Sequence, residues 1–94
     1  MTAASATTRT FKIVNEKGLH ARASAKFVEV VEAFDASAEV CRDGMCVSGD
    51  SIMGLLMLGA SRGTSIEVRI TGAEAEKLAD ALEALVANRF GEDY

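Results

Sequence analysis

Several residue types and patterns are missing from this chain of 94 residues, and each absence excludes a class of protein. No run approaches the roughly 18 apolar residues that suggest a membrane-spanning helix, so we expect no membrane partner. The chain has no proline and its glycines are scattered, so no segment is typical of an interdomain linker. The net charge is −4 and no basic patch occurs, which argues against nucleic acid as the ligand.

The start of the chain also lacks a targeting pattern. Residues 1–8 are small and polar and have no apolar core of the kind a secretory signal carries, so we expect a cytoplasmic protein. With 49% hydrophobic residues and no internal repeat, the rest is typical of one small globular domain. We assign residues 1–7 to a flexible N-terminal tail and 8–94 to a single domain.

Cysteine is scarce, since the chain holds only Cys41 and Cys46, on either side of an Asp43-Gly44 pair. Two cysteines with no histidine nearby do not complete a tetrahedral zinc site, so we expect no metal. Opposite positions across a hairpin permit a disulfide only in favourable geometry, and a chain without an export signal should stay reduced. We therefore expect two free thiols or inert packing residues.

Histidine is scarcer still, and the single His20 lies where a loop is expected to become a helix. A neutral imidazole is nucleophilic near physiological pH, and a helix N-terminus offers unpaired N–H groups and the positive end of a dipole to an anion. Arg22 could clamp a phosphate with charge-assisted hydrogen bonds. The pattern favours a phosphoryl acceptor, although a lone histidine at such a place is more often a helix cap or a surface residue.

Hydrophobic periodicity predicts alternating strands and helices in the order β-α-β-β-α-β-α. Short connections and alternating strands indicate an α+β fold with an antiparallel or mixed sheet of about four strands. We expect strands at 8–14, 37–42, 45–48 and around Ile66 to Ile70, and helices at 21–34, 51–58 and up to about 87.

Local signals refine this outline. Asp43-Gly44 suits a type I′ turn, whose two central residues both need positive φ. Thr71 and Glu74 have the spacing of a capping box for the last helix. The inward faces of the first and last helices are expected to be formed by Ser24, Phe27, Val28, Val31 and Phe34, and by Leu78, Leu82 and Leu85.

The helix at 51–58 has a polar first residue and an apolar remainder. Ser51 suits an N-cap, because its hydroxyl can accept a hydrogen bond from the next turn. The helix has too many apolar side chains to bury them all, so Leu55 and Leu58 are expected in the core and the others on the surface. The surface group is Ile52, Met53, Leu56 and Met57.

Two motifs resemble those of a known family. Gly18-Leu19-His20-Ala21-Arg22 resembles the active-site motif of HPr, the histidine phosphocarrier of the phosphoenolpyruvate-dependent phosphotransferase systems. The stretch from Gly49 to Gly59, GDSIMGLLMLG, resembles the second signature of that family, and 11 to about 85 aligns without a gap. The resemblance implies an open-faced sandwich, in which three helices cover one face of a four-stranded antiparallel sheet.

The resemblance also implies a function. His20 would accept a phosphoryl group from enzyme I and donate it to a IIA-type protein, with no cofactor or metal. Arg22 would clamp the phosphate, helped by the backbone of Ala21 and Arg22, in a monomer that acts as a stoichiometric carrier. Ser51 would be a regulatory phosphosite wherever a serine kinase or phosphorylase is a further partner. Docking is expected on Ala21, Arg22, Ala25, Ile52, Met53, Leu56 and Met57.

The sequence departs from the family pattern at one residue of the motif and resembles one branch of the family more than the other. Ala23 stands where the family usually has proline, which puts the rigidity of the site in doubt rather than its chemistry. The nitrogen-related regulatory branch is favoured over the sugar-transport branch, and a non-catalytic regulatory module or a small-ligand-binding domain remain alternatives. The residues that favour the nitrogen-related branch are Lys26, Glu29, 34–36, 55–58, 66–68 and the acidic residues near 92.

Overall fold

The computed structural model describes residues 5–94, which form four strands, three α-helices and one short 3-10 helix. No helix within these residues has the length and apolar content to cross a bilayer. The elements in chain order are β1 (Ser5–Lys12), α1 (Ala21–Glu32), β2 (Ser37–Arg42), β3 (Met45–Ser48), α2 (Ile52–Met57), β4 (Ser65–Gly72), α3 (Ala75–Ala87) and η1 (Arg89–Gly91).

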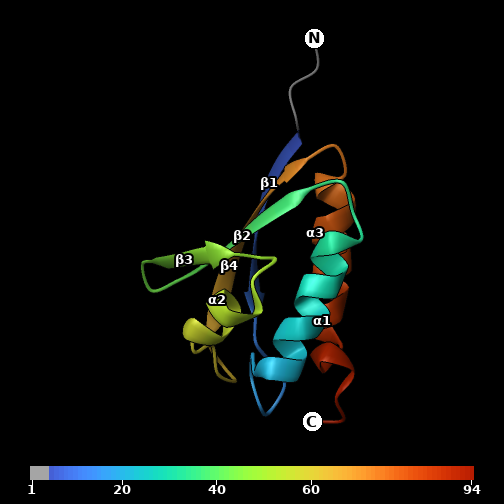
Figure 1. The fold of residues 1–94 in the computed structure, drawn as a ribbon. Coiled ribbons are helices and arrows are strands. Elements are labelled where there is room, and N and C mark those ends of the chain that lie inside the picture. The colour runs from blue at the N-terminus through green and yellow to red at the C-terminus, as the bar shows by residue number, and fades with distance from the viewer. Residues whose placement is uncertain (1–4) are drawn as a thin grey trace.

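The sheet has the strand order β1-β4-β2-β3, and every neighbouring pair is antiparallel. The helices lie on one side of this sheet, with α1 beside α3 and α2 packed against α1 and β3 (Figure 1). The predicted open-faced α+β sandwich is therefore confirmed, and η1 is an addition to it.

The core lies between the inner face of the sheet and the helices. Ile66, Val68 and Ile70 alternate along β4 and are fully buried, while Arg69 between them is exposed. The predicted inner face of α1 is confirmed, except that Phe34 lies beyond the end of the helix and is only partly buried. Other large core side chains are Ile13, Phe27, Val40, Leu55, Leu78, Leu82 and Phe90.

The predicted start of the first strand was three residues late. Residues 5–7, which we assigned to the N-terminal tail, belong to β1 and pair with the end of β4, so that Ser5 is opposite Gly72 and Thr7 is opposite Ile70. Small polar residues carry no hydrophobic period, so only the tertiary pairing reveals this part of the strand. Residues 1–4 of the expected tail lie outside the described residues.

The capping box predicted for the last helix was wrong. Thr71 belongs to β4, and the N-cap of α3 is Glu74, whose side chain makes no capping hydrogen bond. The Glu74 carboxylate instead accepts a hydrogen bond of 2.8 Å from the backbone N–H of Asp35, while Glu74 N–H donates to the Asp35 carbonyl. Further along α3, Val86 is buried and Leu85 only partly so.

The hairpin of β2 and β3 has the predicted boundaries and turn. Asp43 and Gly44 both have positive φ, +49° and +83°, and Cys41 lies directly opposite Cys46. The expectation of free thiols was wrong, because these cysteines form a disulfide across the two strands, with the Cα atoms 4.0 Å apart. The physical reason is the register of the hairpin, which places the two cysteines directly opposite each other and close enough to join.

Candidate functional site

His20 lies at the N-cap of α1, as predicted. Its backbone is extended and its side chain makes no capping hydrogen bond, so the imidazole is available for other contacts. The first helical hydrogen bond runs from Ser24 N–H to the His20 carbonyl at 2.8 Å, which leaves the N–H groups of Ala21 and Arg22 outside the helical pattern. The helix start therefore offers amide donors beside the imidazole.

The loop before His20 is held against the segment that follows α2. Leu19 N–H donates to the Ala60 carbonyl at 2.9 Å, and the Leu19 side chain is buried. Gly18 has a φ of +67°, and a Cβ there would lie 2.6 Å from the Ala60 oxygen and 2.9 Å from the Ser61 Cα. Only glycine fits this close backbone approach, which sets the position of His20.

A carboxylate from the far end of the chain reaches the imidazole. The Glu92 side chain pairs with Nε2 of His20 through Oε2, and both side chains are mostly covered. The other carboxylate oxygen, Oε1, accepts a hydrogen bond of 3.0 Å from Asn15 Nδ2, which also donates to the Gly18 carbonyl at 2.8 Å. Asn15 is fully buried, and its two hydrogen bonds connect the His20 loop to Glu92.

Three further contacts hold the segment that carries Glu92. Phe90 is fully buried in the core, although its φ of +54° is unusual for a residue other than glycine. Lys26 Nζ on α1 donates to the Phe90 carbonyl at 2.7 Å, and Glu16 N–H donates to the Tyr94 carbonyl at 3.0 Å. The site is thus assembled from residues 15–26 and from the C-terminal segment 90–94.

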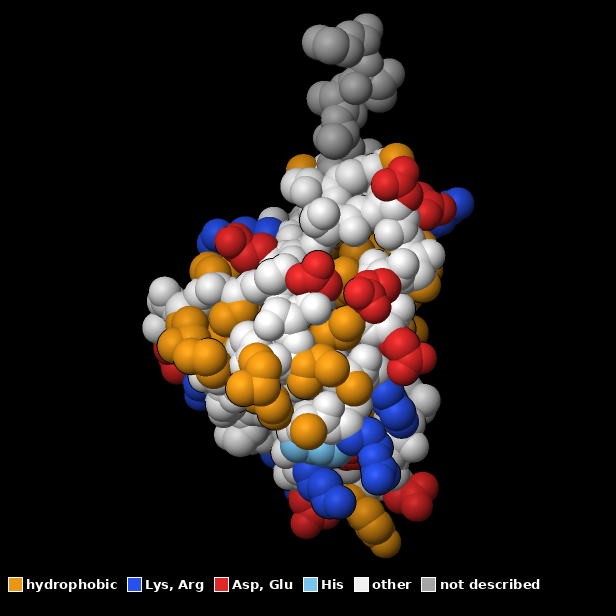
Figure 2. Space-filling model, in the orientation of Figure 1, with side chains coloured by type: hydrophobic (Ala, Val, Ile, Leu, Met, Phe, Trp, Pro, Cys, Tyr) orange, Lys and Arg blue, Asp and Glu red, His pale blue; other side chains and the backbone are white. Residues whose placement is uncertain are grey.

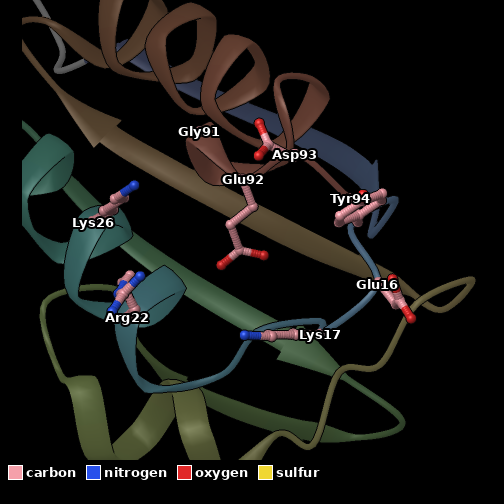
Figure 3. A pocket seen from close by; sticks show the side chains of 8 residues that line it. All are labelled: Glu16, Lys17, Arg22, Lys26, Gly91, Glu92, Asp93 and Tyr94. Carbon is pink, nitrogen blue, oxygen red and sulfur yellow. The ribbon is translucent and has the colours of Figure 1, made fainter.

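Positive charges surround the Glu92 carboxylate. Lys17, Arg22 and Lys26 line the same open pocket as Glu92, and Figure 3 shows the carboxylate pointing into the space between them. Burial of the Glu92 carboxyl tends to raise its pKa, but hydrogen bonds from Asn15 and His20 and the charge of Lys17 outweigh that effect. The pKa of Glu92 therefore lies below the usual glutamate value, and the ionised form is held here.

The helix α2 begins with the predicted N-cap. The Ser51 hydroxyl accepts a hydrogen bond of 3.0 Å from Gly54 N–H, and the helix runs from Ile52 to Met57. Met53 and Met57 are 69% and 67% exposed and Ile52 is 40% exposed. Figure 2 shows hydrophobic side chains gathered next to the pale-blue histidine, which also has lysine and arginine side chains beside it.

The remaining apolar residues of this region divide as expected. Leu55 and Leu58 are buried, and Leu56 is half-buried. On α1, Ala21 and Arg22 are exposed and Ala25 is half-buried, so the predicted docking residues are all accessible at least in part. We call the exposed side chains of Ile52, Met53 and Met57 the α2 patch.

The other cluster of chemically active side chains lies elsewhere. Among the described residues, Glu39, Cys41 and Cys46 form the one group of three that could hold a metal ion. Both sulfur atoms are joined in the disulfide and are not thiolates, the form that binds metals. This group is on β2 and β3 and does not include His20.

Comparison with known proteins shows the family of the chain. The family model described as "PTS HPr component phosphorylation site" matches residues 7–88. The chain belongs to the HPr family. It is 44% identical over 80 residues to the phosphocarrier protein HPr of Cupriavidus necator. That alignment covers 85% of this chain and 90% of the relative. It is therefore an HPr-type phosphocarrier of the phosphotransferase system, a family whose members interact with enzyme I and IIA proteins.

Solved HPr structures share the fold. The HPr crystal structure from Thermoanaerobacter tengcongensis superimposes with a TM-score of 0.89 at 35% identity, covering 94% of this chain and 99% of that one. The HPr from Bacillus anthracis gives a TM-score of 0.82 at 32% identity, covering 87% and 98% of the two chains. These likenesses extend over the whole sandwich.

The structure brings together His20, Arg22 and the α2 patch, but sequence reasoning missed Glu92, Asn15 and Lys26 as parts of the site. In the sequence, the acidic residues near 92 indicate only the branch of the family and give no sign of contact with His20. A usable signal existed in Phe90, an apolar residue just beyond the last helix, because its burial holds the segment with Glu92 against the rest of the domain, where the carboxylate reaches His20.

The low pKa of Glu92 links stability to pH. A carboxyl whose folded pKa lies below its unfolded value of about 4.3 stabilises the fold above that value, and the effect is lost as the pH falls through the folded pKa. Glu92→Gln should therefore lower stability near neutral pH, and the difference from the parent should shrink as the pH falls from about 5 into the acidic range. Urea unfolding at a series of pH values measures this difference.

Asp93→Asn is the matched control, because Asp93 points away from the Glu92 carboxylate in Figure 3. It should keep the pH dependence of the parent. Nitrogen NMR of the imidazole provides a second test, since an ionised Glu92 requires the proton on Nε2 in the neutral ring. Equal pH dependence in the parent and in Glu92→Gln would contradict a lowered pKa of Glu92, and a neutral ring with its proton on Nδ1 would contradict the pairing of Glu92 with His20.

Proposed function

We propose that His20 accepts a phosphoryl group on Nδ1 from phosphorylated enzyme I and passes it to a IIA-type protein. The observation that carries this proposal is the pairing of Nε2 with Glu92. An ionised carboxylate only accepts hydrogen bonds, so Nε2 must carry the ring proton and Nδ1 must carry the lone pair. The nucleophilic nitrogen is thereby selected by the protein.

The transfer step follows from this arrangement. The Nδ1 lone pair attacks phosphorus, a nitrogen–phosphorus bond forms, and the bond from phosphorus to the histidine of enzyme I breaks. The imidazole of His20 gains positive charge, which the Glu92 carboxylate balances through the Nε2 proton. The phosphoryl oxygens are stabilised by the free N–H groups of Ala21 and Arg22 and by the Arg22 guanidinium. Because the donor and the acceptor are both histidines, the free energy of the phosphoryl transfer is close to zero. The main task of the protein is therefore to position the reacting groups.

The partner surface in this proposal combines the helix start and the α2 patch. Ala21, Arg22 and Ala25 on α1 and the α2 patch with Leu56 would contact enzyme I and the acceptor in turn. Exposed methionines suit a surface that docks more than one partner. Ser51 at the edge of this surface is the regulatory phosphosite, because a phosphate there would remain compatible with the helix start and yet repel acidic groups on a partner.

The nitrogen-related regulatory branch is part of this proposal, as are a cytoplasmic location and a monomeric state. The support for the branch is the resemblance carried by Lys26, Glu29 and the acidic residues near Glu92, of which Lys26 also holds the Phe90 carbonyl. Incubation with enzyme I of each branch, with the initial rate of phosphorylation as the readout, separates the two. Faster phosphorylation by the sugar-branch enzyme would refute this assignment.

His20→Ala tests the acceptor. Intact-mass analysis after incubation with enzyme I and phosphoenolpyruvate should show one phosphoryl group on the parent and none on His20→Ala. The group on the parent should be acid-labile, because a phosphoramidate hydrolyses once its imidazole is protonated. A phosphoryl group on the His20→Ala protein would place the acceptor elsewhere.

Arg22→Ala tests the clamp. Arg22 is exposed, so its removal should leave the melting temperature within a few degrees of the parent. Phosphoryl transfer should slow by roughly ten- to a thousand-fold, as expected when a charged donor to a transition state is lost. Arg69→Ala, which removes the same charge from the uncovered face of the sheet, is the matched control and should transfer at the parental rate. Equal rates for Arg22→Ala and the parent would exclude Arg22 from the mechanism.

Ser51→Asp tests the docking surface. The carboxylate can keep the N-cap, so melting should stay close to the parent, whereas burial of the added charge against enzyme I should cost affinity. The enzyme I concentration at half-maximal rate should therefore rise. Ala73→Asp, which adds the same charge in the loop between β4 and α3 at the other end of the sheet, is the control (Figure 1). An unchanged half-saturation point in Ser51→Asp would rule out docking around α2.

A further inference from the structure

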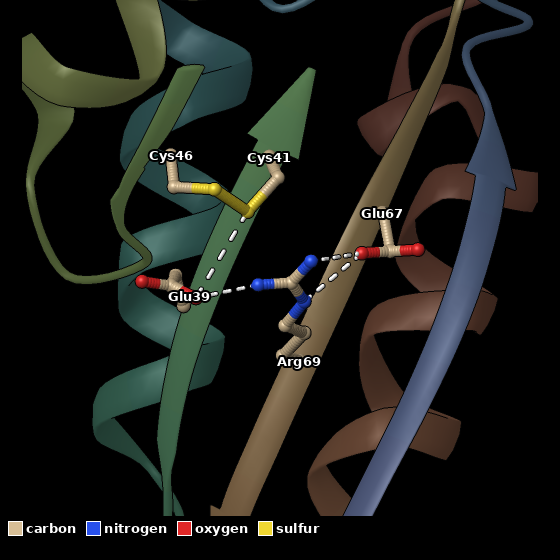
Figure 4. Close-up of a disulfide and its surroundings, with 5 residues drawn as sticks. All are labelled: Glu39, Cys41, Cys46, Glu67 and Arg69. Carbon is tan, nitrogen blue, oxygen red and sulfur yellow. Dashed lines mark hydrogen bonds and ion pairs between the residues drawn. A yellow bond between two sulfur atoms is a disulfide. The ribbon is translucent and has the colours of Figure 1, made fainter. Parts of the chain in front are cut away.

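We propose that Cys41 and Cys46 form a reversible redox site, which a dithiol reductant opens and whose opening weakens docking on α2. The disulfide joins directly opposite residues of β2 and β3 and lies on the face of the sheet that the helices leave uncovered (Figure 4). The effect on docking rests on the proposed function, whereas the redox chemistry does not.

The disulfide contributes little to the stability that the β2–β3 hairpin needs in order to form. The stabilisation from a cross-link increases with the length of the loop it closes, and this one encloses only residues 42–45. The turn is already defined by Asp43 and Gly44, whose positive φ values suit a type I′ turn. The fold should therefore survive reduction, as a reversible site requires.

The disulfide is also accessible and has a neighbour suited to the reduced state. Cys41 is 8% exposed, but Cys46 is an exposed residue, and accessible disulfides are the more easily reduced ones. Glu39 Oε1 lies 3.9 Å from Cys41 Sγ and is itself held by Arg69. A disulfide sulfur has no proton to donate, whereas the Cys41 thiol formed by reduction could donate one to this carboxylate.

Reduction is a balanced two-electron exchange. A thiolate of the dithiol attacks Cys46 Sγ, the bond between the two cysteine sulfurs breaks, and Cys41 leaves as a thiolate that takes up a proton. The second thiol of the reductant then displaces Cys46 and closes its own disulfide. The protein gains two electrons and two protons, and the reductant loses the same number.

The β2–β3 hairpin contacts both ends of α2. Through these contacts, opening of the disulfide would affect the docking surface. At the start of α2, Ser51 N–H donates to the Ser48 carbonyl of β3 at 3.2 Å. At its end, Nη1 of Arg42, next to Cys41, donates to the Leu58 carbonyl at 3.0 Å. Between the two ends of α2, Val47 of β3 packs against Gly54. A Cβ placed on Gly54 would lie only 3.0 Å from the Cβ of Val47. A looser β2–β3 pair would therefore loosen the α2 patch.

The experiment compares the protein before and after equilibration with dithiothreitol. Alkylation and mass analysis should show that both thiols form and that an oxidised dithiol regenerates the disulfide. Hydrogen exchange across 45–59 should speed up on reduction, and half-saturation with enzyme I should rise about fivefold or more, a typical size for coupling between sites. The double variant Cys41→Ser with Cys46→Ser should match the reduced protein and ignore dithiothreitol.

Two results would overturn the proposal. One is a disulfide that stays closed in excess dithiothreitol, and the other is a reduced protein whose exchange across 45–59 and half-saturation equal those of the oxidised one. If His20 took no phosphoryl group in either redox state, the proposed function would fail instead. Alkylation and hydrogen exchange would still decide the redox site, because neither depends on phosphorylation.

Discussion

The burial of the inner face of β4 is the constraint on which the rest of the structure depends. Ile66, Val68 and Ile70 are fully buried, and each such side chain contributes about 1.5–3 kcal/mol when it leaves water. Because β4 lies between β1 and β2, only helices packed across the sheet can cover these residues. α1 and α3 do so in opposite directions, which places the start of α1 beside the end of α3 (Figure 1).

This antiparallel arrangement explains why the start of α1 and the segment after α3 build one site. The start of α1 presents His20 and free amides, and the segment after α3 brings Glu92 to the same place. A phosphoryl group on His20 would add about two negative charges near neutral pH. Lys17, Arg22 and Lys26, which line the pocket around Glu92, can balance this charge together with that of the carboxylate.

The sequence was most informative where structure is set by local periodicity or by a short motif. The hairpin, the Ser51 cap, the inner face of α1 and the position of His20 were all predicted from neighbours within a few residues. The failures have a common cause in tertiary contacts. The N-terminal half of β1 is defined by pairing with β4, the start of α3 by contact with Asp35, and Glu92 by the burial of Phe90. None of these contacts produces a hydrophobic periodicity in the sequence.

The replacement of the family's usual proline can be understood in the same terms. Proline at position 23 would stiffen the first turn of α1, and Ala23 is instead buried there without disturbing the helix start. The His20 loop gains its order from elsewhere: from Gly18 against Ala60, and from Asn15 against Glu92. Restraint from outside the helix can hold the imidazole without restricting the helix backbone. The contacts that position the imidazole therefore come from Gly18, Asn15 and the segment that carries Phe90 and Glu92, and not from the side chain after Arg22.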